Sequence, residues 1–329
     1  MRGDLRDTQP RQFRNSTRAC RNRFCVGGVS VQVAGEHDTD VGLGSLLNAF
    51  RVQAYPSDID LHVRRVASLA PCPGRQLFDS GSVWRLYEHE VGFQFDFSAP
   101  VFGGRPYKRL FVDSHFRSAT LNMSEECFKN ISLMVSPLDY PLDELLIVHR
   151  LTQEKAIELH GCGIVGPNGS SNLFVGHSGA GKSTTTRLWT AHHNVQILSD
   201  DRIIVREHWV RDENVRDDEL SENQLREEAT QIFMYGTPWH GEAAFALPDR
   251  APLHRIFILE HGCGNVITRL SRSQTVAELF ARSFVPFHRH EYLASALSFL
   301  ERLADSVPCY HYAFEPDERA VDRILNFHD

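Results

Sequence analysis

The sequence predicts an α/β fold in two parts, a β-rich N-terminal domain over residues 26–140 and an α/β domain over residues 141–329. In the first part, apolar residues alternate with polar ones at a period of two, as in strands with one buried face. In the second part, short runs of isoleucine, leucine and valine alternate with helical patterns. One of these runs ends at a glycine-rich loop, and a helical pattern follows the loop directly.

The bulk composition excludes several classes of protein. The chain has 329 residues, of which 42% are hydrophobic and 23% charged, as in ordinary globular proteins. Its net charge of −7 argues against nucleic-acid binding. No run approaches the ~18 apolar residues that span a membrane, so we expect no membrane partner and a cytoplasmic location. The seven cysteines are scattered, without a C-x-x-C pair, which indicates free thiols.

The N-terminal part begins with an arginine-rich segment, residues 1–25, which lacks the apolar region of a secretory signal and is predicted to be a disordered tail. The segments after it alternate strictly, with valine at positions 29, 31 and 33 and phenylalanine at 93, 95 and 97. We predict strands there and at residues 110–112 and 120–122. The pattern suggests a packing or oligomerisation module and carries no recognisable chemistry.

The C-terminal part is predicted to begin with a helix at residues 141–151, which joins the two domains. Residues 211–229 are highly charged and are predicted to form a solvated loop. The remaining elements fall into two sets: strands at 157–165, 173–175, 195–198, 203–205 and 253–259, and helices at 184–191, 275–282 and 291–304.

The strongest motif is G-H-S-G-A-G-K-S at residues 176–183, which matches the P-loop pattern G-x-x-x-x-G-K-[ST]. Glycines let backbone N–H groups turn inward around phosphates, and the following helix adds its positive end. Lys182 would bind the β- and γ-phosphates, and the Ser183 hydroxyl would bind Mg²⁺. We therefore predict a site for ATP and Mg²⁺ formed by Gly176, His177, Ser178, Gly179, Ala180, Gly181, Lys182, Ser183 and Thr184.

Two adjacent acids, Asp200 and Asp201, follow the strand predicted just after this loop. One acid would hold Mg²⁺ and the other would accept a proton from an attacking hydroxyl. The structural alternative is a loop cap or an ion pair with Arg202. His160 precedes the loop and would donate a hydrogen bond near the phosphates, or would simply be packed. The L-S-G-G-Q segment of ABC transporters and the N-K-x-D motif of GTPases are both missing.

The order of these motifs resembles the HPr kinase/phosphorylase family. His160-Gly161, the loop at 176–183 and Ser199-Asp200-Asp201 follow one another as in the catalytic core of that family, over residues 158–205. The resemblance implies a P-loop domain related to phosphoenolpyruvate carboxykinase. It also implies that Asp201 is the catalytic base, with Asp200 beside it, and that His160 is an active-site histidine. Because HPr kinases assemble into oligomers, it further implies a homo-oligomer.

The sequence departs from the family at two functional positions. The glutamate signature E-x-R-G-x-G, which helps to hold the metal, is missing, and Glu242 in G-T-P-W-H-G-E is the nearest candidate. Arg282 is the candidate for the late catalytic arginine. The alternatives are a packed turn around Glu242 and a helix C-terminal cation at Arg282. The chain is most similar to HPr-kinase-related proteins whose substrate is unassigned.

Three hypotheses follow for the function. In the first, the chain is a phosphotransferase that moves the γ-phosphoryl of MgATP to a hydroxyl, with a serine of a small protein or peptide as the acceptor. A small-molecule kinase shares every motif and differs only in its substrate. In the second, the chain is a nucleotide-gated binding module without phosphotransfer. The third, a phosphoenolpyruvate carboxykinase, needs metal and carboxylate-binding residues that the sequence does not supply.

Overall fold

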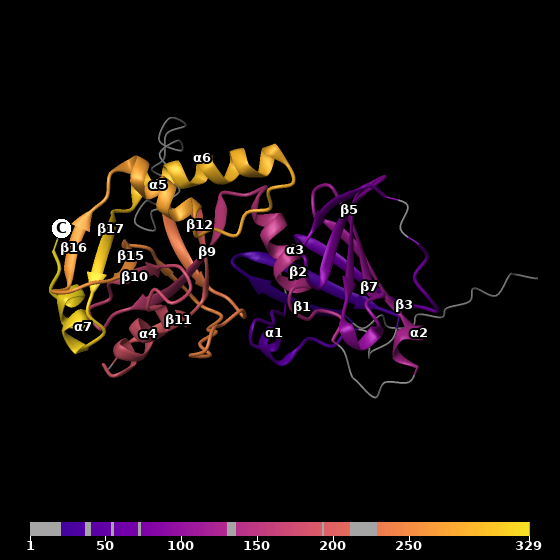
Figure 1. Cartoon of the computed structure of the whole chain (residues 1–329), viewed down its shortest axis with the longest axis horizontal. Helices are drawn as coiled ribbons and strands as arrows, with labels where there is room; N and C mark the ends of the chain where they lie inside the picture. Colours follow the sequence, from indigo (N-terminus) through magenta and orange to yellow (C-terminus); the bar gives the residue numbers. More distant parts are fainter. Residues whose placement is uncertain are drawn as a thin grey trace, which may run out of the picture.

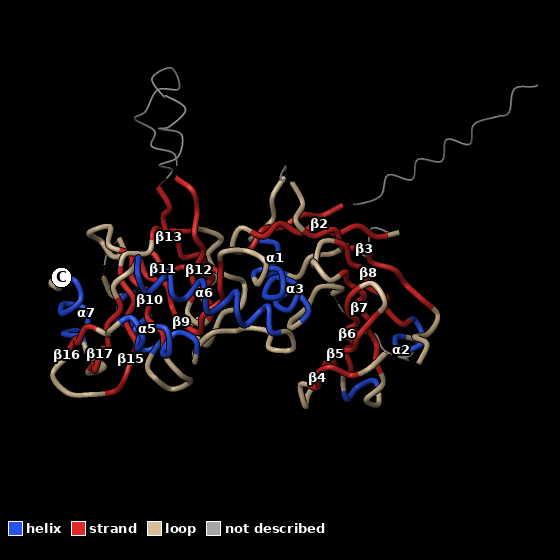
Figure 2. The backbone as a smooth tube through the Cα atoms, turned by 90° about the horizontal axis from the view of Figure 1, so that it is seen from above, coloured by secondary structure: helices blue, strands red, loops and turns tan. Residues whose placement is uncertain are grey.

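The computed structural model describes residues 21–36, 41–53, 56–71, 74–129, 136–192, 194–210 and 229–328. These residues form a mixed α/β protein with two large sheets and few helices (Figure 1). The helix α3 (Leu142–Leu151) lies between the two sheets, as Figure 2 also shows from above. None of the helices in the described ranges is long and apolar enough to cross a membrane.

The N-terminal sheet has eight strands in the order β1-β2-β3-β8-β7-β6-β5-β4. The β2–β3 and β3–β8 pairs are parallel and the others antiparallel. The small helical segments are α1 (Ser45–Ala49), α2 (Glu125–Phe128) and a 3₁₀ turn, η2 (Pro100–Phe102). The strands are β1 (Arg21–Val26), β2 (Val29–Gly35), β3 (Ile59–Val66), β4 (Gln76–Asp79), β5 (Trp84–His89), β6 (Gly92–Ser98), β7 (Pro106–Asp113) and β8 (Ser118–Ser124).

The predicted strands of this half are confirmed, with two differences. Strand β1 begins inside the segment that we expected to be a disordered tail. It forms because Phe24 and Val26 are buried while the strand pairs antiparallel with β2. Residues 1–20 of the expected tail lie outside the described residues.

The second difference concerns β6, where alternation predicted one buried and one solvated face. Both faces are buried, because Asp96 forms an ion pair with Arg109 of the neighbouring strand, with distances of 2.6 Å and 2.7 Å. Gln94 donates to the same carboxylate at 2.9 Å. A polar strand face can therefore be internal when its charges are paired.

The C-terminal sheet has nine strands, eight of them in the order β14-β13-β12-β9-β10-β15-β17-β16, while β11 pairs with β9. The β10–β15 and β15–β17 pairs are parallel. The strands are β9 (Ala156–Val165), β10 (Ser171–Val175), β11 (Gln196–Ser199), β12 (Arg202–Val210), β13 (Ala229–Gly236), β14 (Arg250–Pro252), β15 (Arg255–His261), β16 (Val266–Arg269) and β17 (Cys309–Phe314).

Helices cover both faces of this sheet. Leu279 of α5 (Arg272–Phe280) and Phe299 of α6 (His290–Ser306) belong to one apolar cluster. Trp189 of α4 (Lys182–Thr190) and Val321 of α7 (Glu318–Leu325) belong to another. The glycine-rich loop therefore follows a fully buried strand, β10, and leads to the face of the sheet that α4 covers.

Every element predicted in this half is found, whereas the strands β13, β14, β16 and β17 and the helix α7 were not predicted. In α6, Phe299 and Tyr292 take core positions, whereas Leu297 is 39% exposed. Of the charged segment 211–229, residues 211–228 lie outside the described residues.

Specific contacts join the two halves. The indole Nε1 of Trp239 donates to Asp143 of α3 at 3.0 Å, and Arg206 of β12 donates to the carbonyl of Gly27 at 2.8 Å. Ile204 and Trp239 also pack into the apolar cluster of the N-terminal half. The loop that follows β13 is thereby held against α3.

Candidate active site

The glycine-rich loop at residues 176–183 connects β10 to α4 and depends on its glycines. Gly179 and Gly181 have φ angles of 81° and 105°, a region that favours glycine. A Cβ atom at Gly181 would lie 2.3 Å from the Phe314 ring. No side chain caps α4, and the first N–H groups of a helix have no partner within it. The loop therefore offers uncapped backbone donors.

Lys182 lies folded over this loop and is 6% exposed. Its ammonium donates to the carbonyl oxygens of Gly176 and His177, at 3.0 Å and 3.1 Å. Burial lowers the pKa of Lys182, the nearby Asp201 carboxylate opposes this shift, and Arg202 adds to it. The charge of Lys182 therefore interacts with that of Asp201, the second acid after β11. The other predicted loop residues lie at the surface or half-buried: His177, Ser178, Gly179, Ala180, Ser183 and Thr184.

His160, on β9, connects the parts of the site. Its N–H donates to the carbonyl of Arg282 at 2.8 Å, and its carbonyl accepts from the N–H of Gly176 at 3.3 Å. Its Nε2 donates to Oδ1 of Asp201 at 2.9 Å. The adjacent Gly161 N–H donates to the carbonyl of Asp201 at 3.0 Å. One residue thus touches the start of the loop, the predicted base and the predicted arginine.

Asp201 is partly buried, with 26% of its side chain exposed, and forms an ion pair with Arg202. Burial raises the pKa of Asp201, but the hydrogen bond from His160 and the charge of Arg202 outweigh burial and leave the pKa below its ordinary value. The carboxylate is therefore ionised at neutral pH.

Asp200 has a different environment from Asp201, because it is 1% exposed and accepts three backbone hydrogen bonds. The donors are the N–H groups of Gly241 at 3.0 Å, Ala243 at 2.8 Å and Phe245 at 3.2 Å. A metal ion at Asp200, which the sequence suggested, would compete with these bonds. In the described ranges, no group of three or more histidine, cysteine or acidic residues is placed to hold a metal ion.

The two remaining candidates, Glu242 and Arg282, differ in their exposure and in their distance from the site. The Glu242 side chain is 87% exposed and lies 3.9 Å from Arg187 of α4. Arg282 is nearly buried and binds the carbonyl of Glu278 at 2.9 Å as well as its carboxylate. The charge of Arg282 still contributes to the lowered pKa of Lys182. The structure thus brings Arg282 to the site and leaves Glu242 at its edge.

An acidic pair that the motifs did not indicate holds Arg202. The guanidinium Nε lies 3.0 Å from Glu144 of α3 and 3.4 Å from Glu158 of β9. Burial and the neighbouring Glu144 raise the pKa of Glu158 well above its ordinary value. One signal was available, because Glu158 lies two residues before His160 and so on the same face of the strand.

The chain matches no model of a known protein family and no curated protein sequence.

Proposed function

We propose that the chain is an ATP-dependent phosphotransferase, which moves the γ-phosphoryl group of MgATP to the hydroxyl of a serine in a small protein or peptide. Its C-terminal half would be a P-loop domain of the HPr kinase/phosphoenolpyruvate carboxykinase type. The proposal rests mainly on one juxtaposition: the loop lysine, Lys182, shares its electrostatic environment with Asp201, which is ionised and oriented by His160 at 2.9 Å.

The loop would bind the nucleotide phosphates. Its glycines let the backbone approach an anion closely, and the uncapped start of α4 offers N–H donors and the positive end of the helix. Lys182 would exchange its two carbonyl partners for phosphate oxygens. Since burial lowers the pKa of Lys182, its charge is poorly compensated without a ligand, and a polyphosphate supplies the missing counter-charge.

Mg²⁺ fits this site through a limited set of ligands. The ion commonly keeps several waters and binds phosphate oxygens plus one or two protein groups. The Ser183 hydroxyl is the group available, because both oxygens of Asp201 already accept from His160 or Arg202 and Asp200 is occupied by backbone donors. Bound there, Mg²⁺ would neutralise charge on the transferring phosphoryl group.

The acceptor would enter a groove of about 480 Å³ beside Asp201, which we call the acceptor groove. Tyr140, Arg202, Trp239 and His240 are among its lining residues. The acceptor oxygen would bond to the γ-phosphorus while the bond from that phosphorus to the β–γ bridging oxygen breaks. Asp201 would take the hydroxyl proton, and ADP would leave. Because its pKa is lowered, Asp201 would act first by orienting the hydroxyl and would accept the proton late.

The experiment that tests this proposal measures transfer of label from radiolabelled MgATP to pools of serine-containing peptides. We expect the wild-type protein to label at least one pool. Asp201→Asn should reduce labelling by at least about 100-fold while nucleotide binding persists. The exposed Asp249→Asn is the matched control and should behave as wild type. Full labelling by Asp201→Asn would contradict the role of Asp201.

The outward position of Glu242 and the engagement of Arg282 with Glu278 favour a second function, a nucleotide-gated binding module. In that case ATP would order the loop that Asp200 holds, and no phosphoryl group would move. The two functions differ in one outcome: partner binding that survives in Asp201→Asn and is lost only in Lys182→Ala would support the module.

A further inference from the structure

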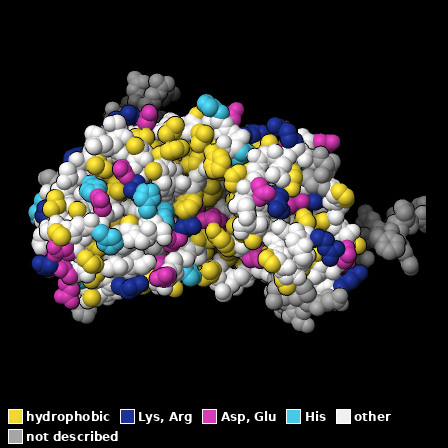
Figure 3. Space-filling view, viewed as in Figure 1, with side chains coloured by type: hydrophobic (Ala, Val, Ile, Leu, Met, Phe, Trp, Pro, Cys, Tyr) yellow, Lys and Arg dark blue, Asp and Glu magenta, His cyan; other side chains and the backbone are white. Residues whose placement is uncertain are grey.

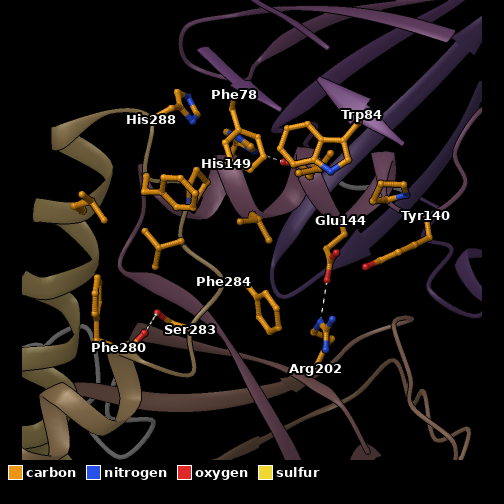
Figure 4. A pocket seen from close by; sticks show the side chains of 17 residues that line it. Phe78, Trp84, Tyr140, Glu144, His149, Arg202, Phe280, Ser283, Phe284 and His288 are labelled. Atoms are coloured by element: carbon orange, nitrogen blue, oxygen red, sulfur yellow. Dashed lines mark hydrogen bonds and ion pairs between the residues drawn. The ribbon is translucent and has the colours of Figure 1, made fainter. Parts of the chain in front are cut away.

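A second cavity, of about 540 Å³, lies between the two halves of the molecule (Figure 4). Phe78 and Trp84 come to it from the N-terminal sheet, and Phe284 and Phe287 come from the segment between α5 and α6. We call it the aromatic pocket. Figure 3 shows apolar side chains gathered in the hollow between the two halves. Ligand sites commonly form at such junctions, in cavities of this size.

The aromatic pocket adjoins the acceptor groove. Tyr140 and Arg202 line both cavities, and Arg202 forms an ion pair with Asp201. Its guanidinium lies over the Phe284 ring, 4.0 Å from the ring centre. Figure 4 shows Arg202 at one end of the pocket and Phe78 at the other. A chain with its hydroxyl at Asp201 would therefore place a neighbouring side chain over the pocket.

The rings around the pocket contact one another but leave apolar surface exposed. The ring centres of Phe287 and Phe78 lie 5.3 Å apart in an edge-on contact, and those of Phe78 and Trp84 lie 5.0 Å apart. Even so, Phe287 is 65% exposed and Tyr140 is 62% exposed. An entering apolar ring would remove this surface from water and would gain edge or offset contacts that an aliphatic chain cannot make.

Two residues of the pocket lining, His149 and His288, each carry a buried ring nitrogen, Nε2, without a partner in the described part of the chain, and such acceptors select among aromatic rings. His149 donates from Nδ1 to the carbonyl of Leu145 at 2.7 Å, and its Nε2 is buried without a partner in the described part of the chain. Burial lowers the pKa of His149 to about 3, so the ring is neutral and Nε2 is an acceptor. The O–H of a phenol or the N–H of an indole could donate a hydrogen bond to this acceptor.

We propose that the aromatic pocket binds a tyrosine or tryptophan side chain of the same peptide whose serine reaches Asp201. This inference depends on the proposed phosphotransfer. Shared lining residues favour one continuous peptide over a separate small ligand. The aromatic walls and the acceptor at His149 favour a ring with an N–H or O–H group.

The test uses libraries of short peptides with one fixed serine, in which each flanking position in turn is varied. Transfer of label from radiolabelled MgATP is measured for every member. We expect one position at a fixed offset from the serine to favour tyrosine and tryptophan over alanine by about tenfold. Phenylalanine should be preferred over alanine but less than tyrosine and tryptophan.

Two variants examine the pocket directly. Phe287→Ala should remove most of the aromatic preference, whereas Trp209→Ala, at a comparably exposed ring outside the pocket, should leave it intact. His149→Phe keeps a ring in place and removes the acceptor. This variant should reduce the preference for tyrosine and tryptophan over phenylalanine, because only Nε2 of His288 remains as an unpartnered ring nitrogen on the lining.

The outcomes separate this inference from the function on which it depends. Labelling without aromatic preference, or with a preference that Phe287→Ala leaves unchanged, would overturn the pocket assignment and leave phosphotransfer standing. If wild-type protein binds MgATP but labels no member of any library, both the peptide-kinase proposal and the pocket assignment fall. Aromatic selection that Phe287→Ala removes would support both.

Discussion

His160 Nε2 donates to Asp201 Oδ1 at 2.9 Å, and the backbone of His160 is bonded to both Gly176 and Arg282. The histidine therefore fixes the carboxylate relative to the glycine-rich loop. Its hydrogen bond also helps to lower the pKa of Asp201 against the effect of burial. Orientation and ionisation of the proposed base thus depend on the same side chain.

Replacing His160 tests this dependence. His160→Leu removes the hydrogen bond, so the pKa of Asp201 should rise and the acid limb of the kcat/KM profile should move to higher pH. His160→Gln places an amide donor near the position of Nε2 and should keep the limb close to that of wild type. The measurement is the pH profile of phosphoryl transfer. Equal profiles for the two variants would show that the hydrogen bond does not set the ionisation.

Asp200 is predicted to act on the loop at residues 241–245 and not on a metal. Asp200→Asn replaces one acceptor oxygen by a donor, which faces backbone N–H groups. We expect a loss of roughly 2–4 kcal/mol in the free energy of unfolding, together with faster hydrogen exchange at Gly241, Ala243 and Phe245. Denaturant titration and exchange measure the two effects. Unchanged stability with a higher Mg²⁺ requirement would instead identify Asp200 as a metal ligand.

His149 should make the protein sensitive to acid. Its pKa is lowered to about 3 by burial, whereas the unfolded chain has the ordinary value of 6.5. The unfolded state therefore binds the proton first, and stability falls as pH drops below 6.5. At about 1.36 kcal/mol per unit, the loss from this group reaches roughly 3 kcal/mol near pH 4, as an upper bound.

The matched variant is His149→Phe, which retains ring contacts with Phe116 and Phe95. Its free energy of unfolding should fall less steeply than that of wild type between about pH 6.5 and pH 4. Chemical denaturation at several pH values measures the two slopes. Parallel slopes would mean that the buried imidazole is not the group that titrates.

Local patterns in the sequence predicted many elements but not every environment. Valines 29, 31 and 33 fixed the buried face of β2, because alternation reports directly on one side of a sheet. Strand β17 was not predicted, although Tyr312 and Phe314 are core residues, because its pairing with β15 is not encoded nearby.

The site was predicted to a similar extent. The sequence indicated that His160, Lys182 and Asp201 would act together, and the structure places them in one network. The residues alone did not show which of Asp200 and Asp201 faces the site, since adjacent residues on an extended chain point to opposite sides. Long-range packing decides which of the two carboxylates faces the backbone of residues 241–245. Glu144 of the acidic pair was missed because only long-range packing brings α3 to Arg202.

The central claim is that the loop at residues 176–183 binds MgATP, and calorimetric titration of the purified protein tests it most directly. We predict micromolar binding by wild type and no measurable binding by Lys182→Ala, with Asp201→Asn close to wild type. Absence of binding by the wild-type protein, or unchanged binding by Lys182→Ala, would contradict the account and remove the basis for phosphotransfer.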